Sequence, residues 1–286
     1  MADKSTDRRS LAPAQAIKDR QREWANRTNR AVLERGYCDC ADTNLLGGLS
    51  DAAKREFGDG GGSELGDGVT PGKIQALHSS SALACNWFDY WRDRDFSVLA
   101  DAFGVPSQFV SLRLEAKLPT GMRGADANLD VLLTTAEGAL FGIESKFTEP
   151  YTPSPLKTQL KPQYFAQNRA AWADAGLPGC QAVAERIRTG EHEFTMLDVA
   201  QLLKHMLALA RAGSRWTLCC LWYEVPGADA SQHRTELQRF SDALGQDQPH
   251  FRAMTYQELF AGMEPLVGSE HTEYMSYLRD RYILTD

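Results

Sequence analysis

Residues 109–118, FVSLRLEAKL, alternate between hydrophobic and polar positions, as expected of a strand with one buried face. Residues 129–135, LDVLLTT, are almost wholly apolar after Asp130 and predict a central strand buried on both faces. A short turn at 136–138 leads into a third expected strand at 139–147. The short connection makes neighbouring strands antiparallel, so this region predicts a three-strand meander.

On both sides of the meander, the spacing of hydrophobic residues changes to the 3.6-residue period of a helix. Residues 198–211, DVAQLLKHMLALAR, show it most clearly, with Asp198 at the N-cap position and Gln201 three residues later, as in a capping box. Two later strands are expected at 216–225 and 251–256. Further helices are expected at 12–35, 73–91, 96–103, 163–175, 257–263 and 271–282. The order predicts a mixed α/β domain whose later strands are joined through helical crossovers.

A glycine-rich stretch at 58–72, GDGGGSELGDGVTPG, is typical of a loop. We therefore expect two regions: a helical and Gly-rich N-terminal extension at 1–72 and the main domain at 73–286. The end of the stretch, GVTPGK, is one residue too short for a phosphate-binding loop, and Ile74 replaces its Ser or Thr. A nucleotide-binding function is thereby excluded.

The composition sets limits on the class of protein. The net charge of −7 argues against coating of nucleic acid by bulk electrostatics. Residues 113–169 nevertheless carry seven Lys and Arg against six Asp and Glu, so charge near a site there can still suit a polyanion. No apolar run is long enough to span a membrane, and the N-terminus has no signal-peptide core, which predicts a cytoplasmic protein without membrane contact.

Three residues in the meander suggest chemistry. Asp130 lies at the beginning of an apolar strand, where a purely solvated carboxylate is poorly placed. Glu144 and Lys146 are two apart in the next strand, so their side chains share a face. Because the two strands are antiparallel neighbours, the two carboxylates can converge. Taken alone, the Glu-x-Lys pair could equally be a solvated ion pair.

Two close carboxylates repel each other and need a cation. Oxygen ligands favour Mg²⁺, with Mn²⁺ as an alternative, and such an ion can polarise a phosphate and lower the pKa of an attacking water. Lys146 would orient that water or stabilise charge in the transition state. Glu115, on the first strand, is the preferred third acid, although an exposed pair with Lys117 explains it equally well. A Ser-His-Asp hydrolase is set aside because no G-x-S-x-G motif is present.

LD followed by ESK on consecutive strands resembles the PD-(D/E)xK nuclease superfamily, and in particular a bacterial family of restriction endonucleases within it. Similar segments include ALHSSSALACNWF, LEAKLPTG, NLDVLL, GIESKFTEPY and QLLKHMLAL, between residues 73 and 282. The resemblance implies a restriction-endonuclease-like mixed sheet flanked by helices. It also implies metal binding by Asp130, Glu144 and the Ser145 carbonyl, with Lys146 as the catalytic lysine. Leu129 departs from the proline of the superfamily name.

Several other residues are candidates for substrate binding. His78, Ser80 and Asn86 lie near an expected helix start, where backbone N–H groups can hold a phosphate or a serine can simply cap the helix. Gln159 and Gln163 follow the third strand, although their spacing differs from that of the Gln and Tyr in exonuclease branches of the superfamily. Lys204 and His205 lie off the apolar stripe of their helix, where they could contact DNA or only solvent.

The leading interpretation is therefore a Mg²⁺-dependent DNA nuclease. The alternatives are a non-catalytic member of the same fold that binds DNA or a partner, and a structural or regulatory protein of a defence locus. The sequence leaves open endonuclease or exonuclease action, DNA or RNA preference, the recognition sequence and a homodimer. It contains no methyltransferase or helicase motif, so a methyltransferase or defence-system partner would be a separate chain.

Overall fold

The computed structural model describes residues 12–60, 64–122, 124, 126–166 and 169–283. Its centre is a five-stranded mixed sheet of order β1-β2-β3-β4-β5, in which the first three strands are antiparallel and β4 and β5 continue parallel to β3. The strands are β1 Phe109–Leu118, β2 Ala127–Thr135, β3 Leu140–Lys146, β4 Trp216–Trp222 and β5 Phe251–Thr255. The predicted three-strand meander, with later strands joined through helical crossovers, is confirmed, and with it the α/β class.

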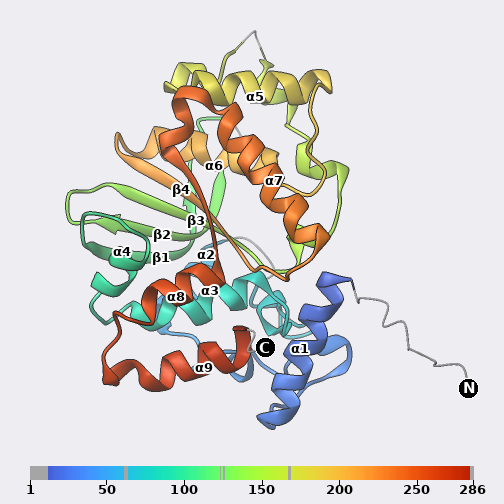
Figure 1. The fold of residues 1–286 in the computed structure, drawn as a ribbon, viewed down its shortest axis with the longest axis vertical. Helices are drawn as coiled ribbons and strands as arrows, with labels where there is room; N and C mark the ends of the chain where they lie inside the picture. The colour runs from blue at the N-terminus through green and yellow to red at the C-terminus, as the bar shows by residue number, and fades with distance from the viewer. Residues whose placement is uncertain (1–11, 61–63, 123, 125, 167–168, 284–286) are drawn as a thin grey trace, which may run out of the picture.

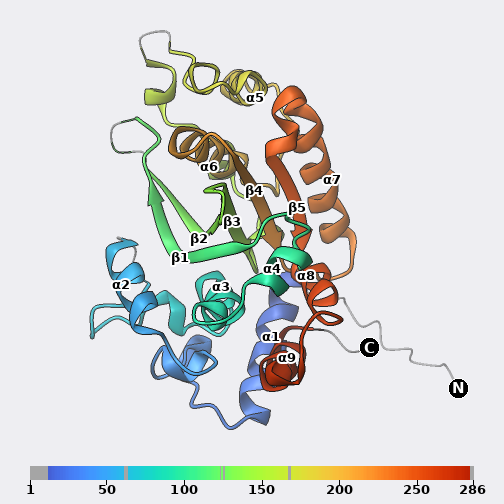
Figure 2. The same cartoon turned by 90° about the vertical axis from the view of Figure 1, so that its left-hand side faces the viewer.

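Helices cover both faces of this sheet (Figures 1 and 2). On one side lie α5 Pro178–Thr189, α6 Val199–Ala212 and α7 Ala228–Ala243. On the other lie α1 Pro13–Arg27, α3 Ser80–Phe88, α4 Ser97–Ala102, α8 Tyr256–Met263 and α9 Thr272–Tyr282, with α2 Asp51–Gly60 beside β1. This arrangement is consistent with a restriction-endonuclease-like fold. None of the helices in the described ranges combines the length and apolar character needed to cross a bilayer.

The register of the sheet places three acidic residues at one level. The pairs Leu114↔Val131 and Ala116↔Leu129 enclose Glu115, so it lies opposite Asp130. On the other side of β2 the last pair is Val131↔Ile143, so the next position brings Asp130 opposite Glu144. The three carboxylates therefore come from three neighbouring strands.

The helical segments differ from the prediction in several places. The expected helix at 163–175 is wrong: 3₁₀ turns occur at Pro162–Tyr164 and Ala173–Ala175, and the α-helix, α5, begins only at Pro178. Buried Trp172 donates from its indole to the Leu203 carbonyl, a tertiary contact that outweighs the helix propensity of the Ala-rich segment. The helices expected at 12–35 and 73–91 are shorter, as α1 and α3, and α2 was not foreseen.

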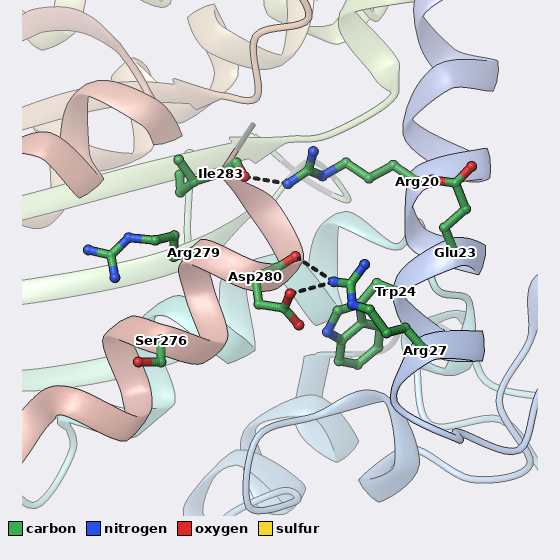
Figure 3. Close-up of a pocket in the computed structure, with 8 residues that line it drawn as sticks. All are labelled: Arg20, Glu23, Trp24, Arg27, Ser276, Arg279, Asp280 and Ile283. Atoms are coloured by element: carbon green, nitrogen blue, oxygen red, sulfur yellow. Dashed lines mark hydrogen bonds and ion pairs between the residues drawn. The ribbon is translucent and has the colours of Figure 1, made fainter. Parts of the chain in front are cut away.

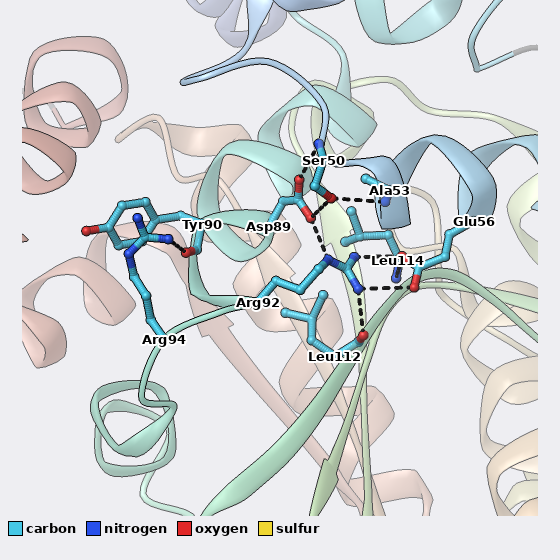
Figure 4. A network of polar contacts seen from close by, with 9 residues as sticks. All are labelled: Ser50, Ala53, Glu56, Asp89, Tyr90, Arg92, Arg94, Leu112 and Leu114. Carbon is cyan, nitrogen blue, oxygen red and sulfur yellow. Dashed lines mark hydrogen bonds and ion pairs between the residues drawn. The ribbon is translucent and has the colours of Figure 1, made fainter.

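A polar network attaches α2 to the edge strand β1 (Figure 4). Arg92 forms ion pairs with Glu56 on α2 at 2.7 Å and with Asp89 at 2.8 Å, and it donates to the Leu112 carbonyl of β1. Glu56 also accepts from the backbone N–H of Leu114 at 2.9 Å. The network thus fixes β1 at the residue that precedes Glu115.

Near the termini, α1 and α9 lie side by side (Figure 3). Arg20 on α1 donates to the carbonyls of Arg281 and Ile283, and Arg27 pairs with Asp280. Arg281 is fully buried and donates to Gln21 at 2.8 Å and to Asn44 at 2.6 Å, so the C-terminal helix is bonded to residues of the predicted N-terminal extension. The expected division at residue 72 stays a prediction.

Candidate active site

A cavity of about 470 Å³ lies beside the C-terminal half of β3, between the first residues of α3 and α6. It is lined by five carboxylate side chains, Glu64, Glu115, Asp130, Glu144 and Glu149, and three ammonium side chains, Lys73, Lys146 and Lys204. With His78 neutral, the formal charge of this lining is −2. The cavity therefore combines charges of both signs with a negative excess.

Asp130 and Glu144 meet at this cavity from adjacent strands. Asp130 is the fourth residue of β2, which begins two residues earlier than predicted, and its Oδ2 accepts a hydrogen bond from the backbone N–H of Ser145 at 2.7 Å. This bond lies just beyond the last paired position of β2 and β3, where the strands separate. The Ser145 hydroxyl turns the other way and contacts the Tyr256 hydroxyl at 2.7 Å. The Asp130 side chain thus joins β2 to β3 at a position where the two strands have no backbone pairing.

The side chain of Lys146, the last residue of β3, connects this strand to α6. Its Nζ donates to Glu144 Oε1 at 2.6 Å and to Gln201 Oε1, from the first turn of α6, at 2.7 Å. Its side chain is 14% exposed and is among those that line the cavity. The predicted common face of Glu144 and Lys146 is confirmed by this contact.

His205, one turn further along α6, lies behind Glu144. Its Nδ1 is 3.1 Å from Glu144 Oε2, and neither atom forms a well-aligned hydrogen bond in the described part of the chain. The expectation of a DNA contact or solvated position for His205 is wrong, because the side chain is fully buried. Both oxygens of Glu144 are therefore in contact with nitrogen atoms, one from β3 and one from α6.

The electrostatic environment acts differently on each acid. Burial, with the charges of Glu144 and Glu115, raises the pKa of Asp130 well above its usual value. Burial would also raise the pKa of Glu144, but Lys146 and His205 outweigh it and lower that pKa to about 2. Burial would lower the pKa of Lys146, yet Glu144 and its acidic neighbours raise it. The shifted pKa values of Glu144 and Lys146 keep both groups charged at neutral pH, while a cation near Asp130 would favour the ionised form of that carboxylate.

Glu115 joins the acids through an unusual backbone. Its φ of 49° lies in the left-handed region, which non-glycine residues rarely adopt. Its carboxylate accepts from the Asn128 side chain, and burial together with Glu64 raises its pKa to about 7. Glu64 itself accepts from the Ser81 hydroxyl at 2.7 Å. The alternative of an exposed pair with Lys117 is not what the structure shows, because Glu115 is buried and Lys117 donates to the Asp59 carbonyl.

The residues suit a divalent cation. The two carboxylates Asp130 and Glu144 are oxygen ligands of the kind that Mg²⁺ prefers, and the lining has five carboxyl groups against three ammonium groups. Glu144 Oε2 is a buried acceptor without a well-aligned hydrogen bond. No group of three or more His, Cys, Asp or Glu side chains in the described ranges is arranged to hold a metal ion. An ion would therefore depend on two carboxylates, backbone oxygen and water.

A model of the family described as Restriction Endonuclease associating with ARP matches residues 18–283. The chain belongs to this family. No curated protein and no solved structure matches the chain. The match covers all the residues of the cavity named above, so the cavity belongs to the part of the chain that the restriction endonuclease family shares.

The other predicted substrate-binding residues divide into two groups. His78, Ser80 and Lys204 line the cavity, and Ser79 caps α3 by accepting from Ala82 N–H at 3.2 Å. The remaining three do not line it: Asn86, Gln159 and Gln163. The Asn86 side chain is buried and hydrogen-bonded to Leu46, Asn44 and Tyr282. The prediction that it binds a phosphate is therefore wrong.

Sequence reasoning missed several residues that the fold brings to the cavity. Glu64 and Lys73, joined by an ion pair of 3.0 Å, come from the Gly-rich stretch and the turn after it, where no periodicity marked them. Gln201 was interpreted only as part of a capping box. Asp198 does cap α6 by accepting from Gln201 N–H at 2.9 Å, but the Gln201 side chain reaches Lys146 instead of returning to the cap.

Proposed function

We propose that this chain is a Mg²⁺-dependent deoxyribonuclease of the PD-(D/E)xK type that hydrolyses phosphodiester bonds as a restriction-type endonuclease. The observation that carries the proposal is the convergence of Asp130, Glu144 and Lys146 on one cavity, with Lys146 Nζ 2.6 Å from Glu144. Membership of a restriction endonuclease family supports DNA as the substrate. Mn²⁺ is expected to replace Mg²⁺.

Asp130 and Glu144, with the Ser145 carbonyl, would hold the ion. A bound divalent ion supplies charge neutralisation at the phosphate and a water of lowered pKa. Lys146 presents a charged ammonium held by two acceptors, and one of its three N–H donors is left for water or a phosphate oxygen. Lys204 and Lys73, at the cavity rim, would contact flanking phosphates. Glu115 is proposed as the third acid.

The test is incubation of the full chain with plasmid, linear and branched DNA, and with RNA, in the presence of Mg²⁺ or Mn²⁺. Lys146→Ala should lower cleavage by about 100-fold or more, because it removes the positive charge next to the reacting phosphate. The matched control is Lys54→Ala, which removes a lysine whose side chain is 52% exposed on α2 and lies outside the cavity.

Calorimetry with Mn²⁺ supplies an independent measurement. The wild-type chain should bind the ion and the Asp130→Ala variant should not. Ion binding without cleavage of any substrate would favour the alternative, a non-catalytic module that binds DNA or a partner. Cleavage by Lys146→Ala at the wild-type rate would contradict the proposed role of the lysine.

A further inference from the structure

Two residues of α6 match the two charged residues of β3 in spacing. Gln201 and His205 are four residues apart, which corresponds to a rise of about 6 Å along a helix. Glu144 and Lys146 are two apart, which corresponds to about 6.6 Å along a strand. Gln201 contacts Lys146 at 2.7 Å and His205 contacts Glu144 at 3.1 Å. One face of α6 therefore meets both members of the pair at once.

His205 is a fully buried polar side chain on the inner face of α6. Its neighbours on the inner face of α6 are apolar, namely Leu202, Met206 and Leu209, and its exposure is 0%. A buried imidazole without a partner is unfavourable, and within the described residues the Nε2 of His205 has none. Its Nδ1 lies 3.1 Å from Oε2 of the 1% exposed Glu144, a contact that a proton on Nδ1 would make favourable.

The Gln201 side chain is available to contact Lys146. Its backbone N–H is bonded to the Asp198 cap, so its side chain is not needed at the helix start. Its Oε1 instead accepts from Lys146, on the side of the ammonium that Glu144 does not occupy. Lys146 would keep this acceptor if Glu144 Oε1 turned to another cation.

From this geometry we infer that Gln201 and His205 are positioning residues for the proposed nuclease reaction. His205 holds one oxygen of Glu144, and Gln201 holds the Lys146 ammonium, so that a divalent ion can share Glu144 without displacing Lys146 from the cavity. The inference rests on the proposed function. It assigns different effects to the two residues: His205 acts through ion affinity and Gln201 through the rate of the chemical step.

The test of His205 uses full-length His205→Leu and His205→Asn, with Mn²⁺ affinity from calorimetry as the measurement. Leucine removes the donor, and we expect the affinity to fall about 10–100-fold. Asparagine places an amide N–H near the position of Nδ1, and we expect it to stay within about 3-fold of wild type. If the leucine variant fails to fold, His205→Gln replaces it, because its longer amide reaches the Nε2 position and should weaken binding.

The test of Gln201 uses Gln201→Met and Gln201→Glu, with kcat and KM for DNA measured at saturating Mn²⁺. Methionine keeps the length of the side chain and loses the acceptor, so kcat should fall about 10–100-fold while KM and Mn²⁺ affinity change less than about 3-fold. Glutamate keeps an acceptor for Lys146 and should recover most of kcat. Equal losses in both variants would overturn the role given to Gln201.

The proposed nuclease function and the positioning role of Gln201 and His205 can be overturned by different results. A wild-type chain that neither binds Mn²⁺ nor cleaves DNA overturns the proposed function, and the positioning role with it. A wild-type chain that does both, beside His205→Leu and Gln201→Met variants with unchanged affinity and kcat, overturns only the positioning role. Thermal unfolding of each variant without metal shows that the compared proteins are folded.

Discussion

Asp130 accepts a hydrogen bond from the backbone N–H of Ser145, so the proposed metal ligand also joins β2 to β3. The two roles can be separated by substitution. Asp130→Asn keeps an acceptor oxygen for Ser145 and removes the charge, whereas Asp130→Ala removes both. We expect Mn²⁺ binding to be lost in both variants, but only the alanine variant to lose about 1 kcal/mol in the free energy of unfolding.

The measurements are calorimetry with Mn²⁺ and urea unfolding of the metal-free proteins. The asparagine variant relieves repulsion from Glu144 and Glu115, so its stability should equal or exceed that of wild type. Wild-type Mn²⁺ affinity in Asp130→Asn would contradict the assignment of this residue as a ligand.

The backbone of Glu115 is strained, because its φ of 49° lies in the left-handed region. The carboxylate of this residue lines the cavity. Glycine adopts this conformation without steric cost, whereas alanine retains the clash. We therefore expect Glu115→Gly to be more stable than Glu115→Ala by about 1 kcal/mol in urea unfolding. Both variants lack the carboxylate, so DNA cleavage should fall equally in the two. Equal stability of the pair would show that the backbone relaxes at this position.

The packing of α5 depends on the absence of a side chain at Gly179. A Cβ there would lie 1.7 Å from the Leu244 carbonyl oxygen, so Gly179→Ala must displace α5. We expect a loss of about 3 kcal/mol in the free energy of unfolding. The control is Gly58→Ala in α2, where a Cβ meets nothing within 4 Å and should stabilise the protein by about 0.5–1 kcal/mol. A Gly179→Ala variant as stable as wild type would contradict this packing.

His233 should make the protein less stable in acid. Burial, reinforced by Lys157, lowers its pKa to about 3, and it packs against the Trp222 ring. Below pH 6.5 the unfolded chain takes up a proton that the folded chain refuses, so stability falls as the pH decreases towards 3. The contribution is about 1.4 kcal/mol per pH unit. Urea unfolding from pH 7 to 5 should show a shallower decrease for His233→Phe than for wild type.

The buried His205 also has a lowered pKa, but it is present in both proteins of this comparison. The difference between the two pH profiles therefore isolates His233. Parallel profiles would indicate that His233 is protonated in the folded protein at pH 5.

The sequence predicted the sheet well because its signals are local. Alternation in β1, the apolar run of β2 and the short turn before β3 determine strand pairing, and that pairing alone brings Asp130 towards Glu144. The helix α6 was equally clear, since its apolar period and its Asp198 cap are both encoded within a few residues.

The parts that sequence reasoning missed depend on contacts between distant residues. Gln201 and His205 gain their partners only when α6 packs on β3, and nothing in their own segment distinguishes them from a solvated face. For α2 a signal existed: Ser50 accepts from Ala53 N–H as a helix cap, but the glycines after it favoured a loop. Glu64 has no local signal at all.

The buried guanidinium of Arg281 has a consequence for truncation. Its acceptors Gln21 and Asn44, and the Trp24 ring 4.0 Å below it, all precede residue 73. A chain shortened to 73–286 would keep the positive charge and lose most of the groups that solvate it, at a cost of several kcal/mol. We therefore expect the two ends of the described chain to unfold in one cooperative thermal transition. Limited proteolysis before residue 73 should also loosen the packing of α9 and make that helix susceptible to cleavage.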